Sequence, residues 1–175
     1  MFNDLRASWA LLIGIGFMML GNGLQGTLLA VRATMEGFPT FVTGIMMSGY
    51  YVGIFLGSMI APRLVQRVGH IRVFAALASL ASISILVHGL HVSPISWTAM
   101  RLITGISYAG LFVVAESWLN DRASNETRGQ VLSVYMLITS LGLGGGQFLL
   151  NLSDPLEIEL FVLVSIIVSF GLIPI

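Results

Sequence analysis

The sequence predicts an all-α fold: a polytopic membrane bundle of six transmembrane helices in two inverted three-helix repeats. Of the 175 residues, 56% are hydrophobic and 9% are charged, whereas a soluble domain carries about a quarter charged residues. Six apolar stretches meet or approach the roughly 20 residues that a helix needs to cross a bilayer core of about 30 Å. Polarity does not alternate along them, which disfavours membrane β-strands.

The first span is expected at residues 9–31. It is longer than the roughly 7–15 residues of a signal-peptide core and lacks a clear small-residue cleavage site, so a retained helix is expected. The other spans are expected at residues 41–64, 73–90, 95–118, 131–150 and 156–175. The pairs Ser93-Pro94 and Asp154-Pro155 each place a capping side chain before a proline, which suits the first turn of a helix. They predict the starts of the fourth and sixth helices.

The arginines predict the orientation, because short cytoplasmic loops collect positive charge. Six arginines fall on one side of the predicted topology: Arg6, Arg63, Arg67, Arg72, Arg122 and Arg128. The opposite side has Arg32 and a group of acids, namely Glu36, Asp154, Glu157 and Glu159. Both termini are therefore expected in the cytoplasm, with the chain crossing the cell's inner (plasma) membrane several times.

Composition excludes several classes of site. The formal net charge is zero and lysine is absent, which argues against a nucleic-acid partner. The absence of cysteine removes thiolate metal sites and cysteine nucleophiles. His88 and His91, near the outer end of the third helix, are expected at the membrane interface rather than on a metal, since no third ligand lies nearby. We expect no metal and no cofactor, and membrane lipid as a partner.

Glycines at four-residue spacing mark the second helix of each triplet. They are Gly49, Gly53 and Gly57 in the second helix, and Gly142 and Gly146 in the fifth. Small residues on one face let membrane helices approach closely, so these glycines are expected at helix–helix contacts. The alternative is that these faces slide or rock against a neighbour during a conformational cycle.

Polar residues at membrane depth are the strongest candidates for function, because burying them costs free energy unless they serve a partner or a pathway. Arg101, within the fourth span, is expected to face the bundle interior; the alternative is that its long side chain reaches the interface. Asn22, Gln25, Tyr108 and Gln147 are expected to line a polar cavity with it. The amide residues could instead bond one another across helices.

Glu116 lies fifteen residues after Arg101, about 22 Å along a helix at 1.5 Å per residue, so the two cannot pair directly. Glu116 is therefore expected near the cytoplasmic face. Its expected partners are the arginines of the adjacent loops: Arg67, Arg72 and Arg128. Such a pair could hold helices together in one conformation as a latch, although an exposed pair contributes little and plain solvation is the alternative.

These motifs resemble the amino-terminal half of a major facilitator superfamily transporter. The segment Arg63-Leu-Val-Gln-Arg67-Val-Gly69-His-Ile-Arg72 is similar to the superfamily's signature loop between helices two and three, with Gln66 where the family usually has aspartate. The resemblance implies that Arg67, Gly69 and Arg72 belong to the conformational latch. It also implies a twelve-helix fold, so a missing carboxy-terminal half or a second subunit is an expected partner.

Two further stretches carry the resemblance. Arg101-Leu-Ile-Thr-Gly105 is similar to the family's second motif, whose embedded arginine is associated with substrate or proton coupling. The end of the fourth helix, Ala115-Glu116-Ser117-Trp118-Leu119-Asn120, looks like the signature of a bacterial subgroup of undefined substrate. In the fifth helix, Gln147 follows Gly146 where antiporters place proline, which weakens an antiporter assignment.

The expected function is secondary active or facilitative transport of a small solute by alternating access, and not an enzymatic activity. A coupling proton or cation stays open as a partner, because no acid lies at mid-depth. One alternative is an intramembrane serine protease using Ser107, but neither the fifth nor the sixth helix carries a histidine base, which that chemistry requires. A channel is another alternative, although no selectivity filter is recognisable.

Overall fold

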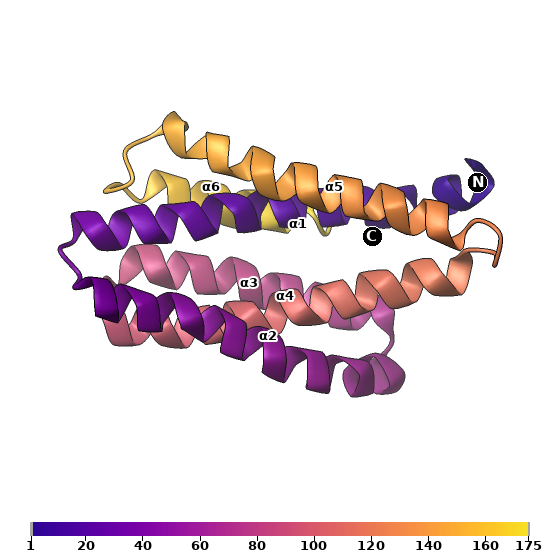
Figure 1. Ribbon diagram of the computed structural model, residues 1–175, viewed down its shortest axis with the longest axis horizontal. Helices are drawn as coiled ribbons and strands as arrows, with labels where there is room; N and C mark the ends of the chain where they lie inside the picture. The colour runs from indigo at the N-terminus through magenta and orange to yellow at the C-terminus, as the bar shows by residue number, and fades with distance from the viewer. Residues whose placement is uncertain (1, 175) are drawn as a thin grey trace.

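The computed structural model describes residues 2–174, with side chains from Trp9 onward. The described chain is all helical, without strands, and its helices run back and forth along one long axis (Figure 1). They are α1 (Phe2–Met35), α2 (Thr40–Val68), α3 (His70–Leu90), α4 (Pro94–Arg122), α5 (Arg128–Phe148) and α6 (Glu159–Phe170), with a 3-10 turn η1 (Leu149–Leu152) after α5. The predicted all-α class is confirmed. The side chain of Arg6 lies outside the described residues.

Five of the described helices are long and apolar enough to cross a membrane, and α6 is shorter, with 12 residues. At 1.5 Å per residue α6 spans about 18 Å. The predicted helical span at 156–175 is therefore wrong in length. The reason lies at Asp154, whose Oδ1 accepts a hydrogen bond of 2.8 Å from the backbone N–H of Leu156. This local turn occupies the expected cap, and the helix begins at Glu159 instead of Pro155.

The other helices extend beyond the apolar stretches. The second runs to Val68 rather than 64, the third begins at His70 rather than 73, and the fourth runs from Pro94 to Arg122. Hydropathy marks the part of a helix at hydrocarbon depth, whereas backbone hydrogen bonds continue into the polar ends. Gly69 alone joins α2 to α3, with φ 90° and ψ 159°, a conformation that is essentially restricted to glycine and costs other residues about 1–3 kcal/mol.

The helices pack in a repeated pattern. α2 packs on α4 as α5 packs on α1, and α3 packs on α4 as α6 packs on α1, while α3 and α6 contact each other. Exchanging the triplets α1–α3 and α4–α6 thus maps these contacts onto one another. Corresponding helices run in opposite directions, as α1 and α4 do in Figure 1. This arrangement is an inverted pair of three-helix units.

Glycines bring the backbones together at the α2–α4 contact. A Cβ added at Gly53 would overlap the backbone oxygen of Leu102, and one at Gly105 would overlap that of Tyr50. Gly49 and Gly57 lie on the same contact, against Thr98 and Ala109 of α4. Any side chain at Gly53 or Gly105 would therefore force the helices apart.

The α1–α5 contact uses the same device at equivalent places. A Cβ at Gly146 would overlap the backbone oxygen of Leu20, and one at Gly23 would overlap that of Leu143. In both contacts the oxygen lies three residues before the partner glycine. Gly142 faces α1 in turn, where its Cβ would stand 2.9 Å from the Cβ of Met19.

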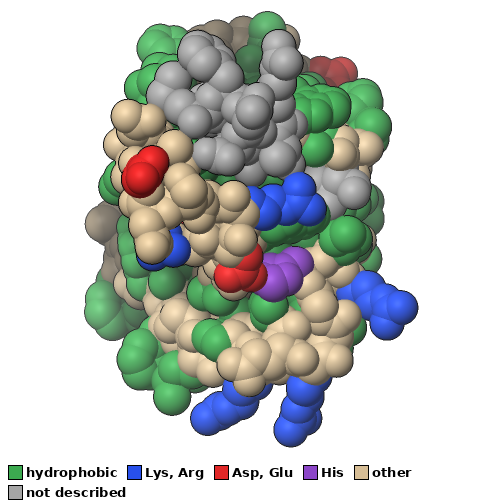
Figure 2. All heavy atoms as spheres, turned by 90° about the vertical axis from the view of Figure 1, so that its right-hand side faces the viewer, with side chains coloured by type: hydrophobic (Ala, Val, Ile, Leu, Met, Phe, Trp, Pro, Cys, Tyr) green, Lys and Arg blue, Asp and Glu red, His purple; other side chains and the backbone are tan. Residues whose placement is uncertain are grey.

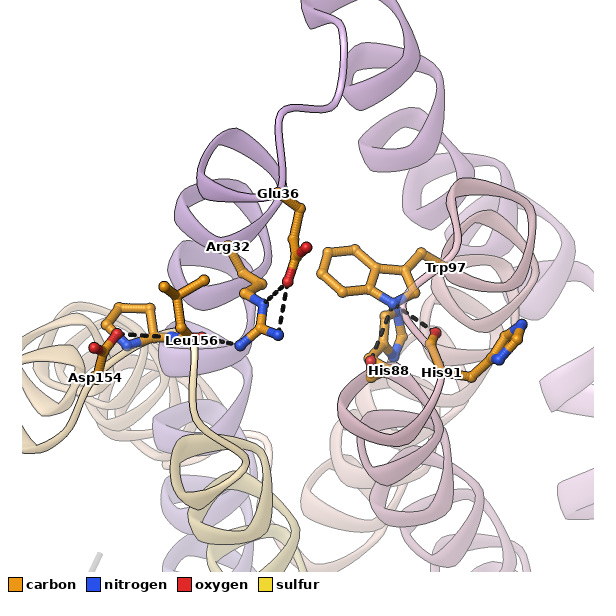
Figure 3. A network of polar contacts seen from close by, with 8 residues as sticks. Arg32, Glu36, His88, His91, Trp97, Asp154 and Leu156 are labelled. Atoms are coloured by element: carbon orange, nitrogen blue, oxygen red, sulfur yellow. Dashed lines mark hydrogen bonds and ion pairs between the residues drawn. The ribbon is translucent and has the colours of Figure 1, made fainter.

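The two ends of the bundle differ in charge. The links α2–α3 and α4–α5, with arginines in the helix ends beside them, lie at the right-hand end of Figure 1. Figure 2 looks onto this end, where arginine side chains stand out from the surface. At the other end Arg32 forms an ion pair of 2.7 Å with Glu36 and donates a hydrogen bond of 2.9 Å to the backbone oxygen of Pro155 (Figure 3). Arg32 thereby ties the end of α1 to the loop before α6.

His88 is fully buried in the last turn of α3, whereas His91, three residues later, is exposed. Nδ1 of His88 lies 2.6 Å from the backbone oxygen of Ser84. Trp97 covers this turn and donates from Nε1 to the backbone oxygens of His88 at 3.0 Å and His91 at 3.1 Å (Figure 3). The α3–α4 turn folds Trp97 back over His88, an arrangement that the local sequence does not reveal.

Candidate functional site

A cavity of about 410 Å³ opens between four helices, two from each triplet. It is lined by Met19, Asn22 and Gly26 of α1, Met47, Tyr50 and Tyr51 of α2, Arg101 and Phe112 of α4, and Thr139, Ser140 and Leu143 of α5. Ligand sites typically combine such an apolar lining with a few polar groups that converge. This cavity is the candidate functional site.

Arg101 is the charged residue of this lining. Its side chain is 4% exposed, and its guanidinium carbon lies 4.3 Å from the centroid of the Tyr50 ring. Nε and Nη1 are buried without a hydrogen-bond partner among the described residues. The cation–π contact with Tyr50 stabilises the guanidinium group. It does not satisfy the two buried donors.

Tyr50 reaches the cavity because its neighbour Gly49 and the following Gly53 bring α2 against α4. Its hydroxyl oxygen accepts a hydrogen bond of 3.1 Å from Nδ2 of Asn22. The Tyr51 ring packs edge-on at a centroid distance of 5.5 Å. Asn22, Tyr50 and Arg101 thus form one contiguous polar cluster, contributed by three helices.

The structure brings together two of the five residues expected to line a cavity, Asn22 and Arg101. Tyr108 shares a helix face with Arg101 but is fully buried, since α1 crosses over it and its hydroxyl donates to the backbone oxygen of Met18 at 3.2 Å. Gln25 is also buried, and its Nε2 has no hydrogen-bond partner among the described side chains and backbone. Gln147 is exposed on α5, one turn beyond Leu143 at the cavity edge.

Several lining residues were not predicted, among them Tyr50, Phe112, Thr139 and Ser140. Tyr50 gives no clear signal in the sequence, since tyrosine in a membrane bundle is usually a packing residue or an interface anchor. The adjacent hydroxyls of Thr139 and Ser140, inside an apolar span, were a usable signal. Phe112 offered none, because it looks like any other apolar residue of the span.

A second hollow, of about 570 Å³, adjoins the cavity and shares Phe112 and Thr139 with it. Glu116 and Asn120 line it from α4, and Tyr135 lines it from α5. The Tyr135 hydroxyl donates a hydrogen bond of 3.4 Å to Oε1 of Glu116. Glu116 is therefore turned towards α5 and towards the face that carries the cavity.

The expected pairing of Glu116 with Arg67, Arg72 or Arg128 is absent from the ion pairs that the structure shows among residues 9–174. Glu116 projects between α4 and α5, whereas the α2–α3 link meets α4 at the next residue. There, Nε2 of His70 lies 3.1 Å from Oγ of Ser117 and 3.9 Å from Oδ2 of Asp121. This partly exposed contact, rather than an arginine pair, joins the start of α3 to the end of α4.

A larger groove, of about 870 Å³, lies between α2 and α4. Its lining is mostly apolar, with Phe41, Ile45, Val52, Ile95 and Leu102, and none of its residues is charged. Apolar grooves of this kind are expected wherever a membrane helix meets lipid or another helix. The charged and hydrogen-bonding side chains of Arg101, Tyr50 and Asn22 line the smaller cavity of about 410 Å³ instead.

Ser107 lacks the surroundings of a nucleophile. It is fully buried, and its Oγ donates a hydrogen bond of 2.9 Å to the backbone oxygen of Ile103, one turn earlier in α4. None of the hydrogen bonds that the structure shows joins Ser107 to a histidine, the base that a serine nucleophile requires. The described residues also contain no cluster of histidine and acidic residues suited to a metal.

Comparison with known proteins gives the family. The model of the Major Facilitator Superfamily matches residues 11–174. The uncharacterized MFS-type transporter YcaD of Escherichia fergusonii is 27% identical over 169 residues, covering 97% of this chain and 44% of the relative. The uncharacterized MFS-type transporter YE1530 of Yersinia enterocolitica is 29% identical over 167 residues, covering 94% of this chain and 43% of the relative.

The chain thus spans less than half of the length of the relatives it matches. Members of this family are transporters rather than enzymes, as the sequence predicted for this chain. Membrane-length helices, inverted triplets and a polar cavity between them accord with that assignment. With the match over residues 11–174, they make this chain a multi-pass membrane protein that belongs to the Major Facilitator Superfamily.

Proposed function

We propose that this chain forms one side of a pathway that moves a small solute across the membrane by alternating access, as secondary active or facilitative transport. The observation that carries the proposal is the cavity formed by both triplets, with Arg101 in its wall. A buried arginine in a membrane helix is expensive to maintain and is expected on a substrate or ion pathway.

The glycine contacts support rigid-body movement. Backbones touch at Gly53 and Gly105, and again at Gly23 and Gly146, with no side chains between them. Such contacts are tightly packed and leave no space for the backbones to shift against each other. The helices within each pair, α2 with α4 and α1 with α5, are therefore expected to move together. Rocking would then occur between this bundle and a complementary one, across the face that carries the cavity. The carboxy-terminal half or a second subunit would supply that face.

We further propose a plasma (inner) membrane location with both termini in the cytoplasm, supported by the arginines at one end of the bundle. A coupling proton or cation would bind elsewhere than beside Arg101, because no acid lines this cavity among the described residues. Glu116 faces the adjoining hollow, nearer the arginine-rich end. The latch made by Arg67, Gly69, Arg72, Glu116 and Arg128 belongs, in this proposal, to another conformation.

Single-cysteine labelling tests alternating access directly, since the chain contains no cysteine. Ser140→Cys places a thiol on the cavity wall. In a cysteine-free background, a membrane-impermeant maleimide should label it from either side of the membrane, with substrate shifting the balance between the sides. Asn125→Cys, in the exposed α4–α5 loop, is the matched control and should react from the cytoplasmic side only.

Two results would contradict this proposal. One is a Ser140→Cys thiol that reacts from neither side. The other is simultaneous reaction from both sides together with an open ion conductance, which would indicate a channel.

Replacing the cavity's charge is the second test. Arg101→Ala should abolish solute binding and uptake by reconstituted vesicles, because the variant removes the cavity's one guanidinium group. Uptake and binding equal to those of the wild-type protein would show that Arg101 has no central role.

A further inference from the structure

We infer that the solute is a small organic anion with a single negative charge, whose carboxylate pairs with Arg101 beside the Tyr50 hydroxyl. This inference rests on the proposed transport function and names the substrate class of its cavity. Three features support it: the uncompensated charge of Arg101, the direction of the hydrogen bonds at Tyr50, and the apolar side chains in the rest of the lining.

The charge is uncompensated within the described chain. Arg101 is 4% exposed, and no aspartate or glutamate stands among the cavity residues. Glu116, the acid of the same helix nearest to the cavity, is fifteen residues away, about 22 Å along the helix. A buried charge without a partner is strongly unfavourable. An anionic ligand removes that penalty when it binds, whereas a cationic one adds repulsion.

The hydrogen bonds leave donors facing the cavity. Asn22 donates to the Tyr50 oxygen, so the proton of the Tyr50 hydroxyl remains available to a ligand. The buried Nε and Nη1 of Arg101 likewise have no acceptor in the part of the chain that the structure describes. A carboxylate is an acceptor with two oxygens, and its hydrogen bonds to a guanidinium group are about twice as strong as neutral ones.

The rest of the lining limits the ligand further. Met19, Met47, Phe112 and Leu143 present apolar surface beside the hydroxyl groups of Thr139 and Ser140. The cavity measures about 410 Å³, a volume typical of small-molecule sites. An apolar wall favours an organic body over a strongly hydrated inorganic ion. One guanidinium group neutralises one negative charge. The fit is therefore to a monocarboxylate with a compact apolar or aromatic body.

The first experiment measures whether Arg101 lacks an internal partner. Arg101→Met keeps the length of the side chain and removes its charge, so it should raise the thermal unfolding temperature of the ligand-free protein in detergent. Arg63→Met, at an exposed arginine of α2, is the control and should leave that temperature unchanged. A clear fall for Arg101→Met would mean that the protein itself pairs this charge, and the inference would be overturned.

The second experiment measures binding by calorimetry and by thermal shift. Its probes are acetate, lactate and benzoate, each beside its neutral amide, together with inorganic phosphate. At least one carboxylate should bind the wild-type protein ten times more tightly than its amide and more tightly than phosphate. Arg101→Met should weaken that binding at least tenfold and Tyr50→Phe by a smaller factor, whereas Arg63→Met should not change it.

Equal affinity for acid and amide, preference for phosphate, or no binding of any carboxylate would overturn the substrate class. The labelling of Ser140→Cys keeps this outcome separate from the transport proposal. Alternating reactivity without carboxylate binding would leave transport intact and reject the anion. Carboxylate binding in a protein whose Ser140→Cys thiol does not react from alternate sides would support the anion site and reject the transport proposal.

Discussion

Of the polar residues within the spans, some line the cavity and others are buried inside the bundle. Arg101 and Asn22 were predicted to line a cavity because polar groups at membrane depth are costly, and the structure places both on its wall. Gln25 and Tyr108 met the same criterion and are buried inside the bundle instead. The free-energy cost of burying a polar group therefore indicates that the residue has some role, but it does not tell a cavity-lining residue from one packed inside the bundle.

Glu116 gives a test at this scale. In the structure it accepts a hydrogen bond from Tyr135, at 3.4 Å, so a latch with Arg67 would form only when the bundle changes conformation. If it does, the charge reversal Glu116→Arg with Arg67→Glu should recover more uptake than either single variant retains, because it restores an attractive pair.

The control for this reversal is Glu116→Arg with Arg63→Glu. Arg63 is a second exposed arginine on the same segment of α2, and this pair should recover nothing. Additive losses for the Arg67 pair, measured as initial uptake rates in vesicles, would reject the latch.

Helix pairs are held by glycines at equivalent places in the two triplets. Gly53 against α4 and Gly146 against α1 each meet a backbone oxygen of the partner helix. The four-residue spacing predicted helix contacts, and it could not indicate the partner helix, since small residues allow close approach to any neighbour. The partners follow from the inverted packing of the triplets.

Alanine substitution tests these contacts. Gly53→Ala and Gly146→Ala should each lower the free energy of unfolding by about 1–3 kcal/mol, because an extra methyl group overpacks the contact. Gly44→Ala and Gly144→Ala are matched controls on the same two helices, with nothing near the added Cβ. The controls should be neutral or slightly stabilising, since alanine favours helix over glycine. Equal effects of all four variants on thermal unfolding in detergent would contradict the contact.

The whole bundle has arginine-rich helix ends on one side and the Arg32–Glu36 pair on the other. This polarity supports the proposed orientation, with the arginine-rich end in the cytoplasm. The His70 contacts with Ser117 and Asp121 lie at that end. They are expected to contribute little to stability, because exposed pairs are screened by water and salt.

Reporter fusions test the orientation. A reporter joined after His91 should be active only as an external reporter, and one joined after Arg122 only as a cytoplasmic one. The α3–α4 turn and the α4–α5 loop lie at opposite ends of α4 in Figure 1, which is why opposite results are expected. The same side for both fusions would refute the topology.

By itself, the sequence determined membrane residence, the all-α class, the family and the places of five of the six predicted spans, because these depend on composition, length and local motifs. Only the tertiary structure decided that Tyr50 lies beside Arg101, that Tyr108 is covered by α1, and that Glu116 faces α5. It also decided that α6 begins at Glu159, after a turn held by Asp154. The reason is physical. Hydropathy indicates how deep a residue lies in the membrane. Which side chain it contacts depends on which helices pack against its own, and that packing joins segments far apart in the sequence.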